Sequence, residues 1–217
     1  MNESIYSDLQ VSRMKKNIKP KNVLDIGANY GMWSISHKVI WPNASFFMIE
    51  ANQCLEQALK DTCDNFLAGC GSYMIAVLAE RSGIRDWWSI GDTGCTGDSL
   101  YKESGTDFYE EVTPVRVATR TLEQVIDYST VFEYVKIDTQ GSELEIMRGG
   151  DRIIRNANHL ELEVSLTEYN KGAPLKEEVV EYCKSKGFGH HIVLGHNGCQ
   201  QDILFSRPIE IERLSKL

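Results

Sequence analysis

Short apolar segments alternate with amphipathic ones along most of the chain, and this alternation limits the fold more than any other feature. Short apolar or alternating runs predict strands, and apolar residues at helical spacing predict helices. Strands are predicted over residues 23–26, 45–50, 73–79, 83–90, 112–119, 132–138, 159–166, 190–194 and 202–205. Helices are predicted over residues 4–16, 30–41, 53–61, 121–128, 142–148 and 175–183.

This order of elements predicts an α/β protein with a mainly parallel sheet and helices on both faces. The last two strands, 190–194 and 202–205, are expected to pair as a terminal antiparallel hairpin. No repeat, low-complexity tract or Pro/Ser-rich linker interrupts the sequence, so residues 1–217 are expected to form one domain. Parallel sheets bind ligands at the carboxyl ends of their strands, so function is sought in the polar residues found there.

The charge of the chain restricts its partners. The sequence has 217 residues with 23 Lys plus Arg against 31 Asp plus Glu, a formal net charge of -8, which disfavours nucleic acid. No apolar run approaches the roughly 18 residues of a membrane span, and the polar start lacks the apolar stretch of a signal peptide. We therefore expect a cytoplasmic protein with a small-molecule partner. The six cysteines show neither CxxC pairs nor zinc-finger spacing, so no disulfide framework or structural zinc site is predicted.

The first predicted strand runs into a turn with the sequence D-I-G-A-N-Y-G at residues 25–31. Its two glycines let backbone N–H groups approach a ligand closely, which is typical of a nucleotide site. The dinucleotide fingerprint G-x-G-x-x-G is broken, because Asn29 and Met32 stand at its second and third glycines. An NAD(P)-binding oxidoreductase and a non-catalytic nucleotide-binding module are kept as alternatives.

Two acidic residues favour a different cofactor. Asp25 lies at the turn, where a carboxylate suits the sulfonium and ammonium groups of S-adenosylmethionine. Glu50 ends the second predicted strand, where its carboxylate can accept both hydroxyls of a ribose. The pair predicts an S-adenosylmethionine site.

Four blocks of sequence carry a resemblance to a known family. They are V-L-D-I-G-A-N-Y-G at 23–31, I-E-A-N at 49–52, Y-V-K-I-D-T-Q-G-S-E at 134–143 continuing to R-G-G at 148–150, and L-E-V-S at 162–165 with Tyr169 after it. Together they resemble the FkbM-type methyltransferases, a branch of the class I S-adenosylmethionine-dependent enzymes. The third block contains the family pattern K-I-D-x-x-G-x-E in full, whereas Ala51 stands where the family usually has Pro.

The resemblance implies a Rossmann-like fold with a seven-stranded sheet, and O-methylation of a hydroxyl on a sugar, a glycan or another small molecule. FkbM-like domains occur alone and within larger glycan-modifying proteins, so a longer chain and a homodimer both stay open. The cofactor contacts expected from it are Asp25, Gly27, Ala28, Asn29, Tyr30, Gly31, Glu50, Ala51, Ala76 and Val77.

Asp138 and Glu163 end predicted strands that would be neighbours, and both match positions where the family carries acids. A sugar hydroxyl is a poor nucleophile, so a base or a metal-bound site must accept its proton. We expect this pair to be catalytic. Either one acid is the base and the other orients the hydroxyl, or both bind a divalent cation such as Mg²⁺ through oxygen. Glu143 is interpreted as a stabiliser of the first turn of its helix.

The glycine-rich segment 91–99, flanked by aromatic residues, is predicted to contact the acceptor, because glycines permit movement and aromatic faces stack on sugar rings. The Trp87-Trp88 pair also fits one core and one surface position of a strand. The expected acceptor contacts are Trp88, Ser99 and Tyr169.

Overall fold

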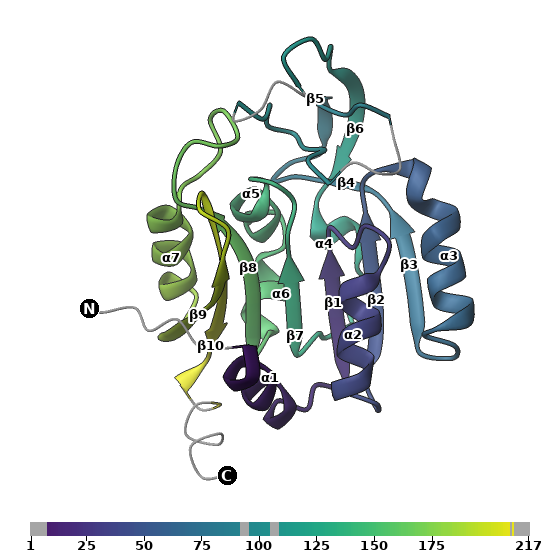
Figure 1. The fold of residues 1–217 in the computed structure, drawn as a ribbon, viewed down its shortest axis with the longest axis vertical. Helices are drawn as coiled ribbons and strands as arrows, with labels where there is room; N and C mark the ends of the chain where they lie inside the picture. The colour runs from purple at the N-terminus through teal and green to yellow at the C-terminus, as the bar shows by residue number, and fades with distance from the viewer. Residues whose placement is uncertain (1–7, 92–95, 105–108, 209, 211–217) are drawn as a thin grey trace.

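The computed structural model describes residues 8–91, 96–104, 109–208 and 210, so the predicted start at Ser4 and part of the glycine-rich segment lie outside the described residues. Its main sheet contains β1 (Asn22–Ile26), β2 (Ser45–Glu50), β3 (Gly71–Ile75), β7 (Tyr134–Ile137), β8 (His159–Ser165), β9 (His190–His196) and β10 (Gln200–Ser206). These seven strands are ordered β3-β2-β1-β7-β8-β10-β9 (Figure 1). β10 runs antiparallel to β8 and β9, and the other neighbours are parallel, so the predicted sheet and its terminal hairpin are confirmed.

Helices cover both faces of this sheet, as predicted (Figure 1). One group comprises α1 (Asp8–Asn17), α2 (Met32–Ile40), the short 3-10 helix η1 (Gln53–Leu55) and α3 (Glu56–Asn65). The other comprises α4 (Leu122–Val125), α5 (Glu143–Arg148), α6 (Asp151–Asn156) and α7 (Lys176–Ser185). Successive side chains of a strand point to opposite faces. Val23 of β1 therefore packs in the apolar cluster of the first group, and Leu24 in that of the second.

A second sheet lies beyond the carboxyl ends of the parallel strands (Figure 1). It consists of β4 (Val77–Leu78), β5 (Gly83–Trp87) and β6 (Val115–Arg120), in the order β4-β6-β5. The single strand predicted over residues 73–79 is therefore wrong. β3 ends at Ile75, and Ala76 donates its N–H to the carbonyl of Glu50 at 2.8 Å. The chain thus passes from one sheet to the other directly beside Glu50.

The prediction also missed α6, because Gly149 and Gly150 suggest the end of α5 and no further helix. In the structure both glycines are places of close packing. A β-carbon would lie 2.5 Å from the carbonyl oxygen of Ala79 at Gly149 and 2.6 Å from Leu122 at Gly150. The chain resumes a helix immediately after them.

Within the described residues, no helix combines the length and the apolar character needed to cross a membrane. The five described cysteines, Cys54, Cys63, Cys70, Cys183 and Cys199, are all free thiols.

Candidate functional site

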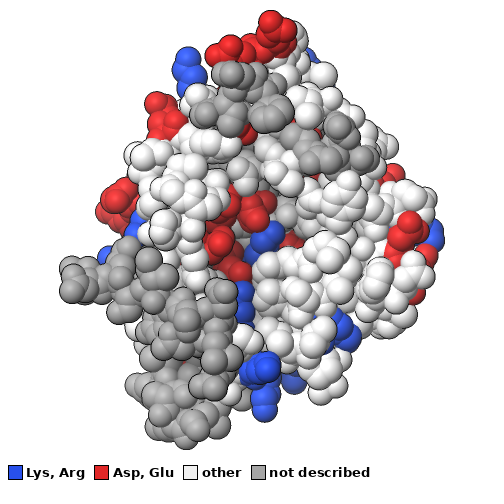
Figure 2. Space-filling model, viewed as in Figure 1, with Lys and Arg blue, Asp and Glu red and all other residues white. Residues whose placement is uncertain are grey.

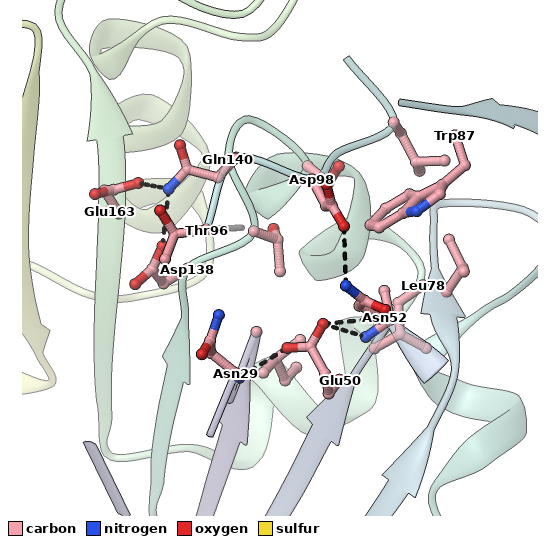
Figure 3. A pocket seen from close by; sticks show the side chains of 18 of the residues that line it. Asn29, Glu50, Asn52, Leu78, Trp87, Thr96, Asp98, Asp138, Gln140 and Glu163 are labelled. Atoms are coloured by element: carbon pink, nitrogen blue, oxygen red, sulfur yellow. Dashed lines mark hydrogen bonds between the residues drawn. The ribbon is translucent and has the colours of Figure 1, made fainter. Parts of the chain in front are cut away.

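A cavity of about 730 Å³ opens at the carboxyl ends of β1, β2, β7 and β8, below the second sheet. Its volume lies in the range of roughly 300–1,000 Å³ that is usual for small-molecule sites. Asp138, Gln140 and Glu163 lie on one side, and Glu50 lies on the floor near Asn52 (Figure 3). The cavity occupies the place where the strand order predicted a ligand.

The turn after β1 forms part of the floor, but its N–H groups are used within the protein. Gly27 and Ala28 both donate to the carbonyl of Ile49, at 2.9 and 3.2 Å. Asn29 donates to Oε2 of Glu50 at 2.7 Å. These donors therefore do not form the phosphate cradle that a glycine turn suggests, and the turn instead fixes the end of β2.

Glu50 is held rigidly at the cavity floor. Besides Asn29, the N–H groups of Ala51 and Asn52 donate to its carboxylate, each at 2.8 Å. Burial raises the pKa of Glu50, and the three backbone donors oppose that rise. The side-chain amide of Asn52 donates to Asp98 at 3.1 Å and so connects the floor to the segment above it. A carboxylate fixed in this way can accept ribose hydroxyls with little loss of entropy.

Asp25 does not line the cavity. Its side chain is fully buried beneath the turn, where Ser34 donates a hydrogen bond to it at 2.7 Å and the Lys136 ammonium lies 3.4 Å away. Lys136 also donates to the carbonyl of Gly27 at 3.2 Å and lies 3.3 Å from Asp138. Burial would lower the pKa of Lys136, but Asp138 and Asp25 outweigh it and raise the pKa. One buried cation thus joins the turn, Asp25 and Asp138.

Asp138 and Glu163 are brought together, as the sequence predicted (Figure 3). The Gln140 amide donates to Oε2 of Glu163 at 2.7 Å and to Asp138 at 3.3 Å, and Gln200 donates to the same Oε2 at 2.7 Å. Burial, followed by repulsion from Asp138 and Glu143, raises the pKa of Glu163 far above its usual range. The raised pKa favours the protonated form of Glu163 beside Asp138.

The loop that carries Asp138 is held in place by the side chain of Glu143, the first residue of α5. The buried Glu143 carboxylate accepts the N–H groups of Thr139 at 2.8 Å and Gly141 at 3.2 Å. Burial raises the pKa of Glu143 to about 7. Its role extends beyond the expected stabilisation of the helix, because its bonds hold the preceding loop. Gln140 in that loop has a φ of 56°, a left-handed conformation that is uncommon outside glycine.

The residues above the cavity only partly match the predicted acceptor contacts. Trp87 lines the cavity, whereas Trp88 does not and instead lies with its ring 5.0 Å from the Lys102 ammonium. Adjacent strand residues face opposite sides, so the two tryptophans cannot both face inward. Ser99 is fully buried and donates to the carbonyl of Gln140 at 2.7 Å. It thus anchors residues 96–104, the covering segment, which lines the cavity from above. Tyr169 does line the cavity.

The structure therefore divides the predicted site residues into two sets. Those lining the cavity are Gly27, Asn29, Glu50, Ala51, Ala76, Val77, Asp138, Glu163 and Tyr169. Those placed outside the lining are Asp25, Ala28, Tyr30, Gly31, Trp88 and Ser99.

Among the polar residues that line the cavity, three that bond its acidic side chains were not singled out by the sequence: Asn52, Gln140 and Gln200. Asn52 and Gln140 lie inside the family-like blocks at 49–52 and 134–143, which was the available signal. Gln200 carries no local signal, because only the pairing of β10 with β8 brings it beside Glu163.

No group of three or more His, Cys, Asp or Glu side chains among the described residues is arranged to hold a metal ion. The structure thus gives no support to the alternative in which Asp138 and Glu163 bind a divalent cation. The five histidines, His37, His159, His190, His191 and His196, all lie outside the cavity lining.

Comparison with known proteins gives one family and a set of similar folds. The family model described as the methyltransferase FkbM domain matches residues 25–189. No curated protein sequence matches this chain.

Among solved structures, precorrin-6y C5,15-methyltransferase from Geobacter metallireducens GS-15 aligns with a TM-score of 0.53 and 14% identity, over 95% of this chain and 94% of that chain. The N-terminal domain of EvdMO1 with S-adenosylhomocysteine bound aligns with a TM-score of 0.55 and 10% identity, over 94% of this chain and 82% of that chain. The same domain is also solved in the presence of S-adenosylhomocysteine and D-fucose. An O-methyltransferase family protein from Burkholderia thailandensis aligns with a TM-score of 0.52 and 8% identity, over 92% of this chain and 56% of that chain. At such low identity these likenesses concern the fold, and they confirm its predicted Rossmann-like methyltransferase class.

Proposed function

Because the chain belongs to the FkbM methyltransferase domain family, we propose that it is an S-adenosylmethionine-dependent O-methyltransferase acting on a hydroxyl of a sugar, a glycan or another small molecule. The observation that carries the hydroxyl acceptor is the pair Asp138 and Glu163 on the cavity wall, across from Glu50. A hydroxyl must lose its proton, and this pair provides a group to accept it. The EvdMO1 domain solved with D-fucose supports a sugar, whereas the precorrin enzyme shows that the fold also serves carbon methylation.

The cavity fits the cofactor in its chemistry. Glu50 offers a fixed carboxylate for ribose hydroxyls, and the apolar side chains of Ile49, Val77 and Leu78 line the cavity near it, as an adenine ring requires. Asp138 adds a carboxylate that suits a cationic sulfonium group. When bound, S-adenosylmethionine supplies a methyl group that the sulfonium has already activated.

The protein's part in the reaction is then to align the acceptor and to take up its proton. We assign the proton to Asp138, because the Lys136 ammonium 3.3 Å away provides a countercharge for its carboxylate. The raised pKa of Glu163 favours its protonated form, so we assign to Glu163 the role of orienting the acceptor by hydrogen bonding. Gln140 and Gln200 hold Glu163 in place from the side of Oε2. Holding the reacting atoms at about 3 Å supplies most of the remaining acceleration.

The alternative of an NAD(P)-binding oxidoreductase finds less support. A pyrophosphate needs backbone donors, and those of Gly27, Ala28 and Asn29 already bond to Ile49 and Glu50. A non-catalytic module would have no need for an acid pair fixed by Gln140 and Gln200 in the cavity wall.

Titration calorimetry with S-adenosylhomocysteine and with NADH separates these functions. We expect the protein to bind S-adenosylhomocysteine and to give no heat with NADH. Binding of NADH without S-adenosylhomocysteine would overturn the proposal. A third outcome, in which S-adenosylhomocysteine binds but Asp138→Asn changes nothing and no acceptor is ever methylated, identifies the binding module.

A further inference from the structure

We propose that the cavity selects acceptors without negative charge: a neutral polyol or an amine-bearing polyol, rather than a phosphorylated, nucleotide-linked or carboxylate-bearing one. This inference rests on the proposed function, because it concerns the acceptor of the same site. It follows from the charged groups in the cavity wall and from the partners of nearby cations.

The described lining contains acidic side chains and no Lys or Arg. In Figure 2, acidic side chains gather in the hollow at the centre of one face, with basic atoms beside them. Like charges brought close together in a poorly solvated cavity repel strongly. The acidic lining residues are Glu50, Asp98, Glu103, Asp138 and Glu163, and because the raised pKa of Glu163 favours its neutral form, the repulsion comes from the other four.

Two cations close to residues of the cavity wall already have other partners. Lys136 lies between Asp25 and Asp138 and is buried. Arg85 pairs with Glu145 at 3.0 Å, outside the lining. These two groups are therefore committed to carboxylates of the protein rather than to an anionic acceptor.

Lys102 lies over the ring of Trp88, which is itself outside the lining, and donates to the carbonyl of Glu110 at 3.2 Å. The sequence of residues 92–95 and 105–108, which the structure does not describe, contains no Lys or Arg. An acceptor with a phosphate or carboxylate would thus enter a wall that provides no matching cation among its described residues.

Two of the acids, Asp98 and Glu103, can discriminate between charged and neutral acceptors, because neither ribose binding nor proton transfer requires them. Asp98 accepts hydrogen bonds from Tyr109 at 3.1 Å, Ser89 at 2.7 Å and Asn52 at 3.1 Å. All three donors are neutral, so these bonds orient the Asp98 carboxylate and leave its charge in place. Glu103 is buried in the same covering segment, where it hydrogen-bonds the hydroxyl of Tyr169.

The test needs no knowledge of the natural acceptor. S-adenosylhomocysteine analogues with nitrogen in place of sulfur are prepared with a propyl arm on that nitrogen, ending in a hydroxyl, an ammonium or a carboxylate. The arm extends from the position of the transferred methyl group, so it probes the acceptor space. Calorimetry at low salt is expected to show the hydroxyl and ammonium arms binding at least about tenfold more tightly than the carboxylate arm. The difference should shrink as salt screens the charges.

Charge-removing variants locate the discrimination. Glu103→Gln and Asp98→Asn are each expected to reduce the difference in affinity between the hydroxyl and carboxylate arms. If Asp98→Asn does not fold, Glu103→Gln alone tests the assignment. Glu177→Gln, at an exposed position of α7, is the matched control and should leave the difference unchanged. A carboxylate arm that binds as tightly as the hydroxyl arm overturns the inference, and an undiminished difference in both variants overturns the assignment to these two acids. Failure of S-adenosylhomocysteine itself to bind overturns the proposed function instead.

Discussion

A β-carbon on Gly27 would lie 1.7 Å from the carbonyl oxygen of Asp138, so the turn after β1 and the residue after β7 meet backbone to backbone. Gly27 also has a φ of +75°, a conformation that other residues adopt only with strain. The contact sets the distance between the cofactor side of the cavity and its proposed base. Lys136 reinforces it by bonding the carbonyl of Gly27 and pairing with Asp138.

Replacing Gly27 by alanine should therefore destabilise the protein severely. The left-handed conformation costs about 1–2 kcal/mol and the overpacking about 1–3 kcal/mol, so we expect a loss of about 2–5 kcal/mol in the free energy of unfolding in urea. Gly69→Ala is the matched control, because Gly69 also has a φ of +75° but a β-carbon there would meet no atom within 4 Å. Equal losses in the two variants would contradict the role given to the contact.

Glu50→Gln should weaken cofactor binding. The Glu50 carboxylate accepts three backbone N–H groups, and an amide nitrogen would place a donor against one of them. A hydrogen bond to a charged group contributes about 1.5–3 kcal/mol, so we expect the Kd for S-adenosylhomocysteine to rise about tenfold or more in calorimetry. Glu56→Gln, at an exposed position of α3, should bind as the wild type does. An unchanged Kd in Glu50→Gln would place the ribose elsewhere.

Gln140→Gly should separate activity from stability. Glycine relieves the left-handed conformation at this position, which offsets the lost hydrogen bonds, so the free energy of unfolding should stay within about 1 kcal/mol of the wild type. Glu163 loses one of the two amides on Oε2, so we expect turnover to fall about tenfold while the Kd for S-adenosylhomocysteine is unchanged. Gln200→Leu removes the other amide and should act similarly on turnover. Full turnover in both variants would show that these amides do not position Glu163.

Each of two buried histidines should lower the stability of the protein in mild acid. Burial lowers the pKa of His159 from 6.5 to about 4, and burial together with Lys15 does the same for His37. Between these pH values the unfolded chain protonates the two histidines and the folded chain does not, so each histidine lowers the free energy of unfolding as the pH falls from about 6.5 to 4. Buried carboxyl groups with a raised pKa, such as Glu163, act in the opposite direction, so the histidine contribution is measured as the difference between variant and wild type. His159→Gln should remove up to about 3 kcal/mol of this loss, so its free energy of unfolding should rise relative to that of the wild type as the pH falls. Exposed His190→Gln should keep the pH dependence of the wild type, and a His159→Gln variant with that same pH dependence would contradict the account.

Much of the fold was predictable because strand and helix periodicity is a local property. Asp138 and Glu163 were also predictable as a pair, since the carboxyl ends of neighbouring parallel strands meet at one edge of the sheet. The side that Asp25 faces was not predictable in this way. Whether a strand residue points into a cavity or under a helix depends on how the strand is packed, and Asp25 faces Ser34 of α2.

The remaining errors have the same origin in tertiary contacts. The choice between Trp87 and Trp88 depends on the alternation within β5, whose register comes from its pairing with β6. The break at Ala76 results from a change of sheet, which leaves the apolar pattern of the sequence continuous. Gln200 reaches Glu163 only through the pairing of β10 with β8.

The central claim is that this cavity transfers a methyl group to a hydroxyl oxygen and that Asp138 takes up the proton. The most direct measurement incubates the protein with S-adenosylmethionine labelled with carbon-13 in its methyl group and with a set of neutral and amine-bearing sugars, and identifies the methylated atom by carbon NMR. We predict a new methyl ether signal whose rate of formation falls at least about tenfold in Asp138→Asn, with S-adenosylhomocysteine binding retained. Label on nitrogen or carbon, or an unchanged rate in Asp138→Asn, would contradict the account.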